Sequence, residues 1–326
     1  MTLHTDLETF RFDPALRRGV EGKRVLITGS GKDGGIGQAL ALAAALNGAA
    51  AVGVHYHRSY SDGIATVEAI NAAGGNAFPV QADVTNTSDV WASRSYVIRH
   101  LGGPPDLLIC NSGLSEKGYL LGRAPREKEG ESPSLRRARA RKAFVENLAD
   151  STAVVNTKVD GFLYLTHLWA GEALHAGTEL QIVYVSSRQA VDPGAGVPGY
   201  VLANFGVLSL PTVLRINLGR QSDKVSAFSV ALPFVRTGMT DAYAEDARVW
   251  GRWQPRMLEP HELAAAFLQL LGRPAAELSE QILQLDVEAA EAGTQLCWSS
   301  IALQPQRQEL RWSREQPLVV SEEGVR

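Results

Sequence analysis

The sequence predicts an α/β fold in which one doubly wound parallel sheet carries helices on both faces. From Lys23 onward, short runs of β-branched and aliphatic residues alternate with longer helix-forming runs. The short runs are apolar nearly throughout, which is typical of parallel strands buried on both faces. Seven of them follow one another in one series, which favours a single large domain over two small ones.

The expected elements follow directly from this alternation. The expected strands are Arg24–Thr28, Ala50–Val54, Ala77–Gln81, Asp106–Cys110, Gln181–Val185, Val225–Ala231 and Gln281–Leu285. The expected helices are Ile36–Leu46, Ser61–Ala73, Asp89–Leu101, Phe144–Leu174, Tyr200–Leu218 and Pro260–Leu271. The residues 115–142, which are rich in Arg and Lys, and the tail after Glu288 do not follow the pattern. We therefore expect an N-terminal extension over 1–22, a domain over 23–288 with a basic insertion at 115–142, and a C-terminal extension over 289–326.

Composition excludes several classes of function. A net charge of -3 indicates no general attraction to nucleic acid or membranes. The two cysteines, Cys110 and Cys297, make no disulfide framework and favour a reducing compartment. The seven histidines show no metal-ligand spacing, so no metal is expected. With no apolar run of about 18 residues and no signal peptide, we expect a cytoplasmic protein without a membrane partner.

A glycine-rich loop joins the first strand to the first helix. It reads Thr28-Gly29-Ser30-Gly31-Lys32-Asp33-Gly34-Gly35-Ile36-Gly37. Glycines let the backbone turn tightly and approach a pyrophosphate, and the helix N-terminus offers free N–H groups. An ordinary tight turn also uses glycine, but the position between strand and helix favours a Rossmann-type dinucleotide site. The expected cofactor contacts here are Gly29, Gly31, Lys32, Gly35, Ile36 and Gly37.

The end of the second strand bears on the choice of cofactor. An NAD site usually has Asp or Glu there to hold the ribose 2′-hydroxyl. This chain has His57 and Arg58 instead, and a guanidinium suits a 2′-phosphate. The sequence therefore favours NADPH, against the alternative that Arg58 is only a solvated strand-end residue.

These features, with others further along the chain, resemble the short-chain dehydrogenase/reductase family over roughly Lys23–Asp286. The resemblance implies that Asp83, with Val84 after it, contacts the adenine. It implies that Asn111-Ser112-Gly113 line the adenine ribose side, and that Thr237, in the segment with Pro233 and Val235, contacts the nicotinamide end. The glycine loop departs from the family, because five residues intervene before Gly35 where most members have three.

The same resemblance points to catalytic residues. Twelve residues separate Ser187 from Tyr200, which matches the family's serine-to-tyrosine spacing. Most members have a lysine four residues after the tyrosine, where this chain has Asn204, and an asparagine where it has Lys158. This reciprocal exchange resembles ketoreductase domains of polyketide and fatty acid synthases. It implies that Tyr200 donates a proton, Ser187 polarises the carbonyl, and Lys158 lowers the pKa of Tyr200. Asn204 would hold a water or backbone group that relays protons.

The sequence thus predicts NADPH-dependent reduction of a 3-oxoacyl or polyketide-like ketone, free or carried on an acyl carrier protein or CoA. The alternative is a catalytically silent NADPH-binding scaffold or sensor. Enoyl reductases of this fold place a lysine about seven residues after the tyrosine, where this chain has Gly206 and Val207. The basic insertion would form a lid or a docking site for an acidic carrier, or simply a solvated loop, and related folds suggest a homo-oligomer.

Overall fold

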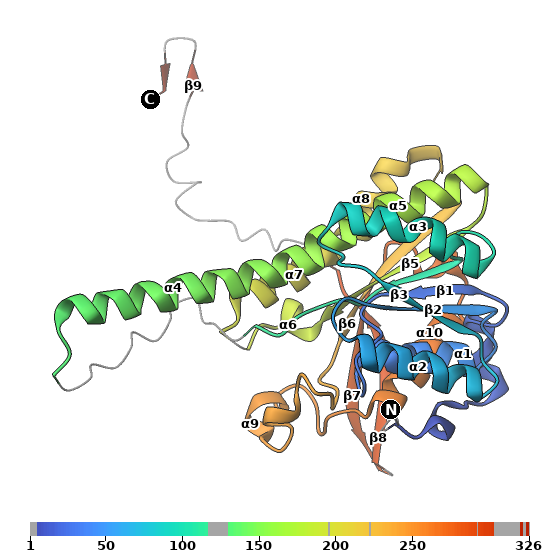
Figure 1. The fold of residues 1–326 in the computed structure, drawn as a ribbon, viewed down its shortest axis with the longest axis horizontal. Helices are drawn as coiled ribbons and strands as arrows, with labels where there is room; N and C mark the ends of the chain where they lie inside the picture. The colour runs from blue at the N-terminus through green and yellow to red at the C-terminus, as the bar shows by residue number, and fades with distance from the viewer. Residues whose placement is uncertain are drawn as a thin grey trace.

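The structure is a computed structural model that describes residues 5–116, 130–194, 196–221, 223–291 and 293–302, together with the backbone of 320–321 and 324–325. Across these residues an eight-stranded sheet has the order β3-β2-β1-β4-β5-β6-β7-β8 (Figure 1). Strands β1 to β7 run parallel, and β8 pairs antiparallel with β7. The predicted doubly wound Rossmann-type sheet is confirmed. The strands are β1 Arg24–Ile27, β2 Ala51–Tyr56, β3 Ala77–Gln81, β4 Leu107–Cys110, β5 Leu180–Ser187, β6 Val225–Leu232, β7 Ile282–Ala290 and β8 Gly293–Ser300, with a separate pair β9 Val320–Ser321 and β10 Gly324–Val325.

Helices cover both faces of the sheet and build two apolar cores. One core lies under α1, α2 and α10, and the other under α3, α5, α7 and α8. The central strands β1 and β4 contribute residues to both cores, which explains why their sequences are continuously apolar. The α-helices are α1 Ile36–Leu46, α2 Tyr60–Ala72, α3 Thr87–Leu101, α4 Pro133–Val155, α5 Gly161–Ala176, α6 Arg188–Val191, α7 Pro198–Leu208, α8 Leu210–Leu218, α9 Ala247–Trp250, α10 Pro260–Leu271 and α11 Ala275–Leu278. Short 3₁₀ turns are η1 Leu7–Phe10, η2 Pro14–Gly19, η4 Gly219–Gln221 and η5 Asp241–Tyr243, and η3 Asn156–Asp160 is a π-helical turn.

The N-terminal segment packs onto the domain rather than extending away from it. Phe10 and Val20 are buried in the core beneath α1 and α10. The side chain of Asn47 holds this segment, accepting from the Phe12 amide at 3.0 Å and donating to the Phe10 carbonyl at 2.7 Å. Residues 5–22 therefore complete one face of the domain.

The longest helical segment begins earlier than the predicted Phe144. Helix α4 starts at Pro133, where the Ser132 side chain accepts from the Leu135 amide at 3.3 Å. It continues through η3 into α5 and ends at Ala176, and its first half extends away from the sheet (Figure 1). The arginine-rich residues 133–142 of the expected insertion are thus helical, whereas 117–129 lie outside the described residues.

The predicted helix Tyr200–Leu218 is two helices, α7 and α8, which meet at Ser209. Pro211 explains the break, because a proline ring disfavours helical geometry at the preceding residue and removes a backbone donor. Together with η4 they form a 24-residue helical stretch that is apolar and long enough to cross a membrane. Its most apolar 18-residue window has a mean hydropathy of 1.4, and 33% of that window is buried inside the protein. Polar residues such as Asn204 and Ser209 interrupt its apolar runs, so the sequence alone did not mark this predicted helix as long and apolar enough for a membrane. Since α7 and α8 pack on β5 and β6, the stretch belongs to the domain.

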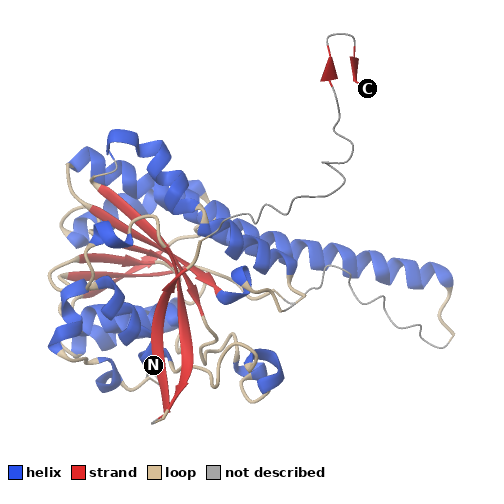
Figure 2. Cartoon of the chain, turned by 180° about the vertical axis from the view of Figure 1, so that it is seen from behind, coloured by secondary structure: helices blue, strands red, loops and turns tan. Residues whose placement is uncertain are grey.

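The segment after Glu288 differs from the expected C-terminal extension. Strand β7 continues to Ala290 and pairs with β8 along its whole length, and the hairpin forms one edge of the sheet (Figure 2). Leu296 and Trp298 of β8 point to the core under α10, and the Trp298 indole donates to the Ala266 carbonyl at 3.1 Å. The boundary expected at 288 therefore falls inside a strand, and the alternation of Thr294, Leu296 and Trp298 is the signal that would have revealed β8.

Candidate active site

The candidate site lies where the strand order reverses, between β1 and β4. In such sheets the connections leave toward opposite faces at this point, and a crevice forms at the carboxyl ends of the strands. Residues 28–37 follow β1 there, 111–113 follow β4, Ser187 ends β5, and 233–237 follow β6. The topology thus brings the four predicted segments to one edge of the sheet.

Close packing explains the glycines of the loop after β1. Gly29 has φ 65°, and a Cβ there would lie 2.8 Å from the Ser112 Cα. A Cβ on Gly37 would lie 2.2 Å from the Gly29 carbonyl oxygen, and one on Gly31 would lie 2.6 Å from the Tyr56 Cβ. The loop and the turn after β4 therefore approach each other as backbone, leaving no room for side chains.

Two strand-end side chains hold Gly29 from opposite sides. The Asn111 amide donates to the carbonyls of Thr28 and Gly29 at 3.1 and 3.2 Å. The Gly29 N–H donates to His55 Nδ1 at 3.2 Å. Burial lowers the pKa of His55 to about 4, so its imidazole is neutral at pH 7 and can accept this bond. The role of His55 was missed from the sequence, where it is only one of seven histidines without metal-ligand spacing.

The extra residues of the loop are fastened to neighbouring helices. Asp62 of α2 accepts from Lys32 Nζ at 3.2 Å and from the Asp33 amide at 3.3 Å, and the Gly34 amide donates to Gln38 of α1 at 2.9 Å. Lys32 is therefore paired with an acid, although its side chain stays 70% exposed. The sequence reading did not consider Asp62.

The loop ends at an uncapped helix N-terminus. Gly35 is the N-cap of α1, Ile36 and Gly37 begin the helix, and no side chain of the described residues caps it. Uncapped first-turn amides and the positive end of a helix dipole make a site for a phosphate group. The arrangement therefore fits a dinucleotide.

The ends of β2 and β3 carry a small charged group. His57 Nε2 lies 3.7 Å from Asp83 Oδ2, and Asp83 Oδ1 accepts from the Thr85 amide and hydroxyl at 2.9 and 2.8 Å. Burial raises the pKa of Asp83, but the Thr85 bonds and the charges of His57 and Arg58 bring it below its ordinary value. Arg58 is exposed beside this group. Asp83 is thus ionised and oriented, with part of its bonding capacity used to shape its own turn.

Lys158 is buried in the π-helical turn η3, and its side chain is directed toward β4 and β5. It is 4% exposed, and its Nζ donates to the Val185 carbonyl at 2.6 Å. A Cβ on Gly113 would lie 3.4 Å from the Lys158 Cε, so the turn after β4 closes over the lysine. Burial lowers the pKa of Lys158 to about 7. A π-turn widens the helix locally and often marks a functional position.

The turn after β3 lies against the same helical segment. Val84 is buried, and a Cβ on Gly161 would lie 2.9 Å from the Val84 Cγ2. The glycine of the Lys-x-x-Gly pattern is therefore explained by close packing between the Asp83-Val84 turn and α5.

The side chains of Tyr200 and Ser187 interact at the end of β5, where the Ser187 hydroxyl acts on the pKa of the Tyr200 phenol. Ser187 also accepts from the Gln189 amide at 3.2 Å as the N-cap of α6, so its hydroxyl has a structural partner as well. Burial raises the pKa of Tyr200 above its ordinary value, and the interaction with Ser187 offsets this in part. The sequence implied the opposite direction, a pKa lowered by Lys158. The physical reason for the difference is that burial removes much of the lysine charge at neutral pH, and its ammonium group donates to Val185.

Asn204 lies one turn after Tyr200 on α7 and is fully buried. The side-chain nitrogen of Asn204 donates to the Tyr200 backbone carbonyl at 2.8 Å, and the backbone carbonyl of Asn204 accepts from the Ser186 hydroxyl at 2.7 Å. Its side-chain oxygen is buried without a partner among the described residues. Three consecutive residues of β5, Val185 to Ser187, therefore contact Lys158, Asn204 and Tyr200 in turn.

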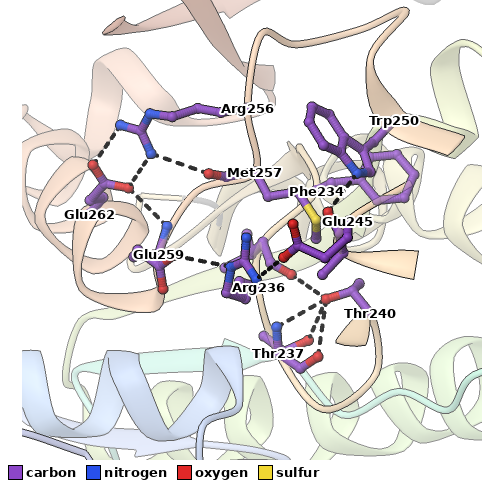
Figure 3. A network of polar contacts seen from close by, with 12 residues as sticks. Phe234, Arg236, Thr237, Thr240, Glu245, Trp250, Arg256, Met257, Glu259 and Glu262 are labelled. Carbon is purple, nitrogen blue, oxygen red and sulfur yellow. Dashed lines mark hydrogen bonds and ion pairs between the residues drawn. The ribbon is translucent and has the colours of Figure 1, made fainter. Parts of the chain in front are cut away.

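The segment after β6 is a braced loop (Figure 3). Pro233 and Val235 are buried, and Val235 bridges to Leu258. Thr237 is 9% exposed, and its amide donates to Thr240 Oγ1 at 2.9 Å. Thr240 in turn donates to the Val235 carbonyl at 2.6 Å. The predicted residues thus form a rigid rim at the end of β6.

Ion pairs hold the outer part of this rim. Arg236 lies between Glu245 and Glu259, at 2.9 and 3.2 Å, and Figure 3 shows it linking the two arms of the loop. Trp253 is 8% exposed and stacks on Phe234, with ring centroids 5.5 Å apart. Trp253 therefore packs inside this loop. Among the residues that the structure describes, no cluster of three or more His, Cys, Asp or Glu could hold a metal ion.

Comparison with known proteins adds to this geometry. Residues 23–248 match the family model for short chain dehydrogenases. The chain belongs to the short chain dehydrogenase family. It is 27% identical over 226 residues to a Staphylococcus aureus 3-oxoacyl-[acyl-carrier-protein] reductase, a match covering 69% of this chain and 80% of that protein.

Other members of the family are similar over shorter stretches or in fold alone. An uncharacterized oxidoreductase of Methylorubrum extorquens is 43% identical over 97 residues, which is 30% of this chain and 38% of that relative's length. A short chain dehydrogenase of Burkholderia cenocepacia in complex with NADP superposes with a TM-score of 0.64 at 24% identity, over 82% of this chain and 97% of that one. A dehydrogenase/reductase of Sinorhizobium meliloti gives a TM-score of 0.66 at 21% identity, over 84% and 97%. The chain therefore shares its fold with solved structures that are less than 25% identical to it in sequence.

Proposed function

We propose that the protein is an NADPH-dependent oxidoreductase that reduces a ketone to an alcohol with Tyr200 as the proton donor. The juxtaposition of Tyr200 and Ser187, whose side chains interact at the end of β5, is the observation that carries the proposal. It provides one acidic proton and one polarising hydroxyl at the same place, which is what protonation of a carbonyl oxygen requires. Similarity to the reductase of Staphylococcus aureus supports the direction of the reaction.

NADPH is the proposed cofactor, and when bound it supplies the hydride. The uncapped N-terminus of α1 would hold the pyrophosphate, and the glycines let the loop pack closely at that helix end. Arg58 would pair with the 2′-phosphate, because the ends of β2 and β3 offer it no acidic residue other than Asp83, which His57 already faces. Lys158 would contact the nicotinamide ribose, since it lies between the turn after β4 and the end of β5. The similar Burkholderia cenocepacia structure holds NADP.

The raised pKa of Tyr200 suits reduction. A general acid must carry its proton before it reacts, and burial keeps the phenol protonated at neutral pH. Ser187 interacts with the phenol and would polarise the carbonyl, while the unpaired Asn204 oxygen would accept from a water that returns a proton to Tyr200. Lys158, with a pKa of about 7, can pass a proton along the same chain at neutral pH.

The substrate and partners are also proposals. We infer a 3-oxoacyl or polyketide-like ketone, from the Lys158–Asn204 exchange and from the relative that reduces a 3-oxoacyl group on a carrier protein. We also infer self-association, because the packed helices α4, α7 and α8 expose large apolar side chains. These are Leu135, Phe144, Val145, Leu148, Leu202, Phe205, Val213 and Ile216.

The test is to follow NADPH oxidation with a panel of β-keto thioesters and cyclic ketones. Tyr200→Phe should lower kcat by about 10²- to 10⁴-fold, the usual contribution of a general acid, and leave NADPH binding intact. Tyr164→Phe, on α5, serves as the control and should retain turnover. Undiminished turnover in Tyr200→Phe would overturn the mechanism. Tight NADPH binding without turnover of any ketone by the wild type would instead favour a silent NADPH-binding scaffold.

A further inference from the structure

A carboxylate from a distant segment lies at the start of the helix that carries Tyr200. Glu116 follows the turn after β4, 84 residues before Tyr200 in the chain. Its Oε2 accepts from the Tyr200 amide at 2.6 Å, and its Oε1 accepts from the Gly199 amide at 3.2 Å. The same oxygen accepts a short hydrogen bond from the Ser151 hydroxyl of α4.

These bonds satisfy two free backbone amides in the first turn of α7. A helix begins with backbone N–H groups that have no partner inside the helix. In α7 the first residue is Pro198, which has no N–H, and the N-cap Val197 has no side chain that could cap. Glu116 accepts from the next two amides, and the Val201 amide donates to the Val197 carbonyl at 3.0 Å. Glu116 therefore does the work of an N-cap residue from another part of the chain.

The surroundings explain why the cap is not local. A Cβ on Gly199 would lie 2.7 Å from the Ser151 backbone, so α4 lies directly against the start of α7. A carboxylate that reaches in from the turn after β4 links three segments, since it bonds α4 through Ser151 and α7 through Tyr200. Its charge also lies at the positive end of the α7 dipole.

We propose that Glu116 is a positioning residue for the reaction, which holds the backbone of Tyr200 so that its phenol meets Ser187. This inference rests on the proposed function. Since the bond is to the Tyr200 amide itself, loss of Glu116 frees the residue whose side chain must be placed to within about 1 Å for efficient proton transfer. The hydrogen bonds of Glu116 in the described residues go to Ser151, Gly199 and Tyr200 and not to the loop after β1, so cofactor binding should not depend on it.

The test uses Glu116→Ala and Glu116→Asp in the full chain, with NADPH and the same ketone panel. We expect Glu116→Ala to lower kcat by about 10- to 100-fold with an unchanged KM for NADPH, and Glu116→Asp to restore part of the loss. Without the carboxylate, the helix dipole lowers the phenol pKa, so the alkaline limb of the kcat profile should move to lower pH. Hydrogen exchange of the Gly199 and Tyr200 amides should become faster in the same variant.

Asn86→Ala is the matched control, because Asn86 accepts from two first-turn amides of α3 in the same way. It should speed exchange in α3 and leave kcat and its pH profile unchanged. Unchanged exchange at Gly199 and Tyr200, or faster exchange with full kcat, would overturn the role of Glu116. Full turnover in Tyr200→Phe, or no turnover of any ketone by the wild type, would overturn the proposed function instead, and amide exchange would still decide whether Glu116 holds α7.

Discussion

Replacing the buried Lys158 with methionine should stabilise the protein in a way that depends on pH. Burial lowers the pKa of this lysine from 10.5 to about 7. Keeping the Lys158 ammonium charged inside the folded protein therefore costs about 5 kcal/mol of free energy, because each pKa unit is worth about 1.4 kcal/mol. Methionine is unbranched, similar in length and carries no charge, so it can occupy the same space.

The pH dependence follows from where the proton is bound. Between pH 7 and pH 10.5 the unfolded chain keeps a proton on Lys158 that the folded protein has released. Stability therefore rises with pH in this window, by about 2 kcal/mol between pH 7 and pH 9. Methionine removes this dependence, so its stability advantage over the wild type should shrink by the same amount. Loss of the Lys158 bond to the Val185 carbonyl changes the stability difference between the two proteins by the same amount at every pH.

Urea unfolding of the cofactor-free protein at pH 7, 8 and 9 measures the effect by linear extrapolation. Lys142→Met is the control, because its side chain is 76% exposed and its stability difference should not change over this range. A wild-type minus Lys158→Met difference that stays constant from pH 7 to 9 would refute the reasoning. Under the proposed function, the same variant should also lose turnover.

The remaining predictions concern the cofactor and the assembly. Arg58→Ala should raise KM for NADPH about tenfold and change KM for NADH little, as expected for loss of a charge-assisted hydrogen bond to the 2′-phosphate. Arg99→Ala on α3 is the control. Equal effects of Arg58→Ala on both cofactors would contradict the assignment. Phe205→Glu should convert a homo-oligomer to monomers in analytical ultracentrifugation, because burying its carboxylate in an apolar interface is unfavourable. The control Trp91→Glu, 65% exposed on α3, should leave the oligomer intact, and a wild type that already sediments as a monomer would exclude self-association through this surface.

Local patterns explain why much of the fold was predictable. Strands buried on both faces are continuously apolar, so each of β1 to β7 could be recognised along the chain without knowing its neighbours in the sheet. Strand β8 was missed because five of its eight residues are exposed and its half-buried positions include the polar Thr294. The start of α4 was also missed, since its first turns are polar and extend into solvent, where no apolar stripe marks a helix.

The sequence by itself determined the order of strands and helices, the glycine loop and the spacing of Ser187 and Tyr200, because these depend on residues close together in the chain. Only the tertiary structure decided how Gly29 is held by His55, where the Lys158 ammonium donates, and that Glu116 caps the helix of Tyr200. It also reversed the expected pKa direction of Tyr200. The physical reason is that burial and long-range hydrogen bonds set the charge and orientation of a side chain, and neither is encoded in local spacing.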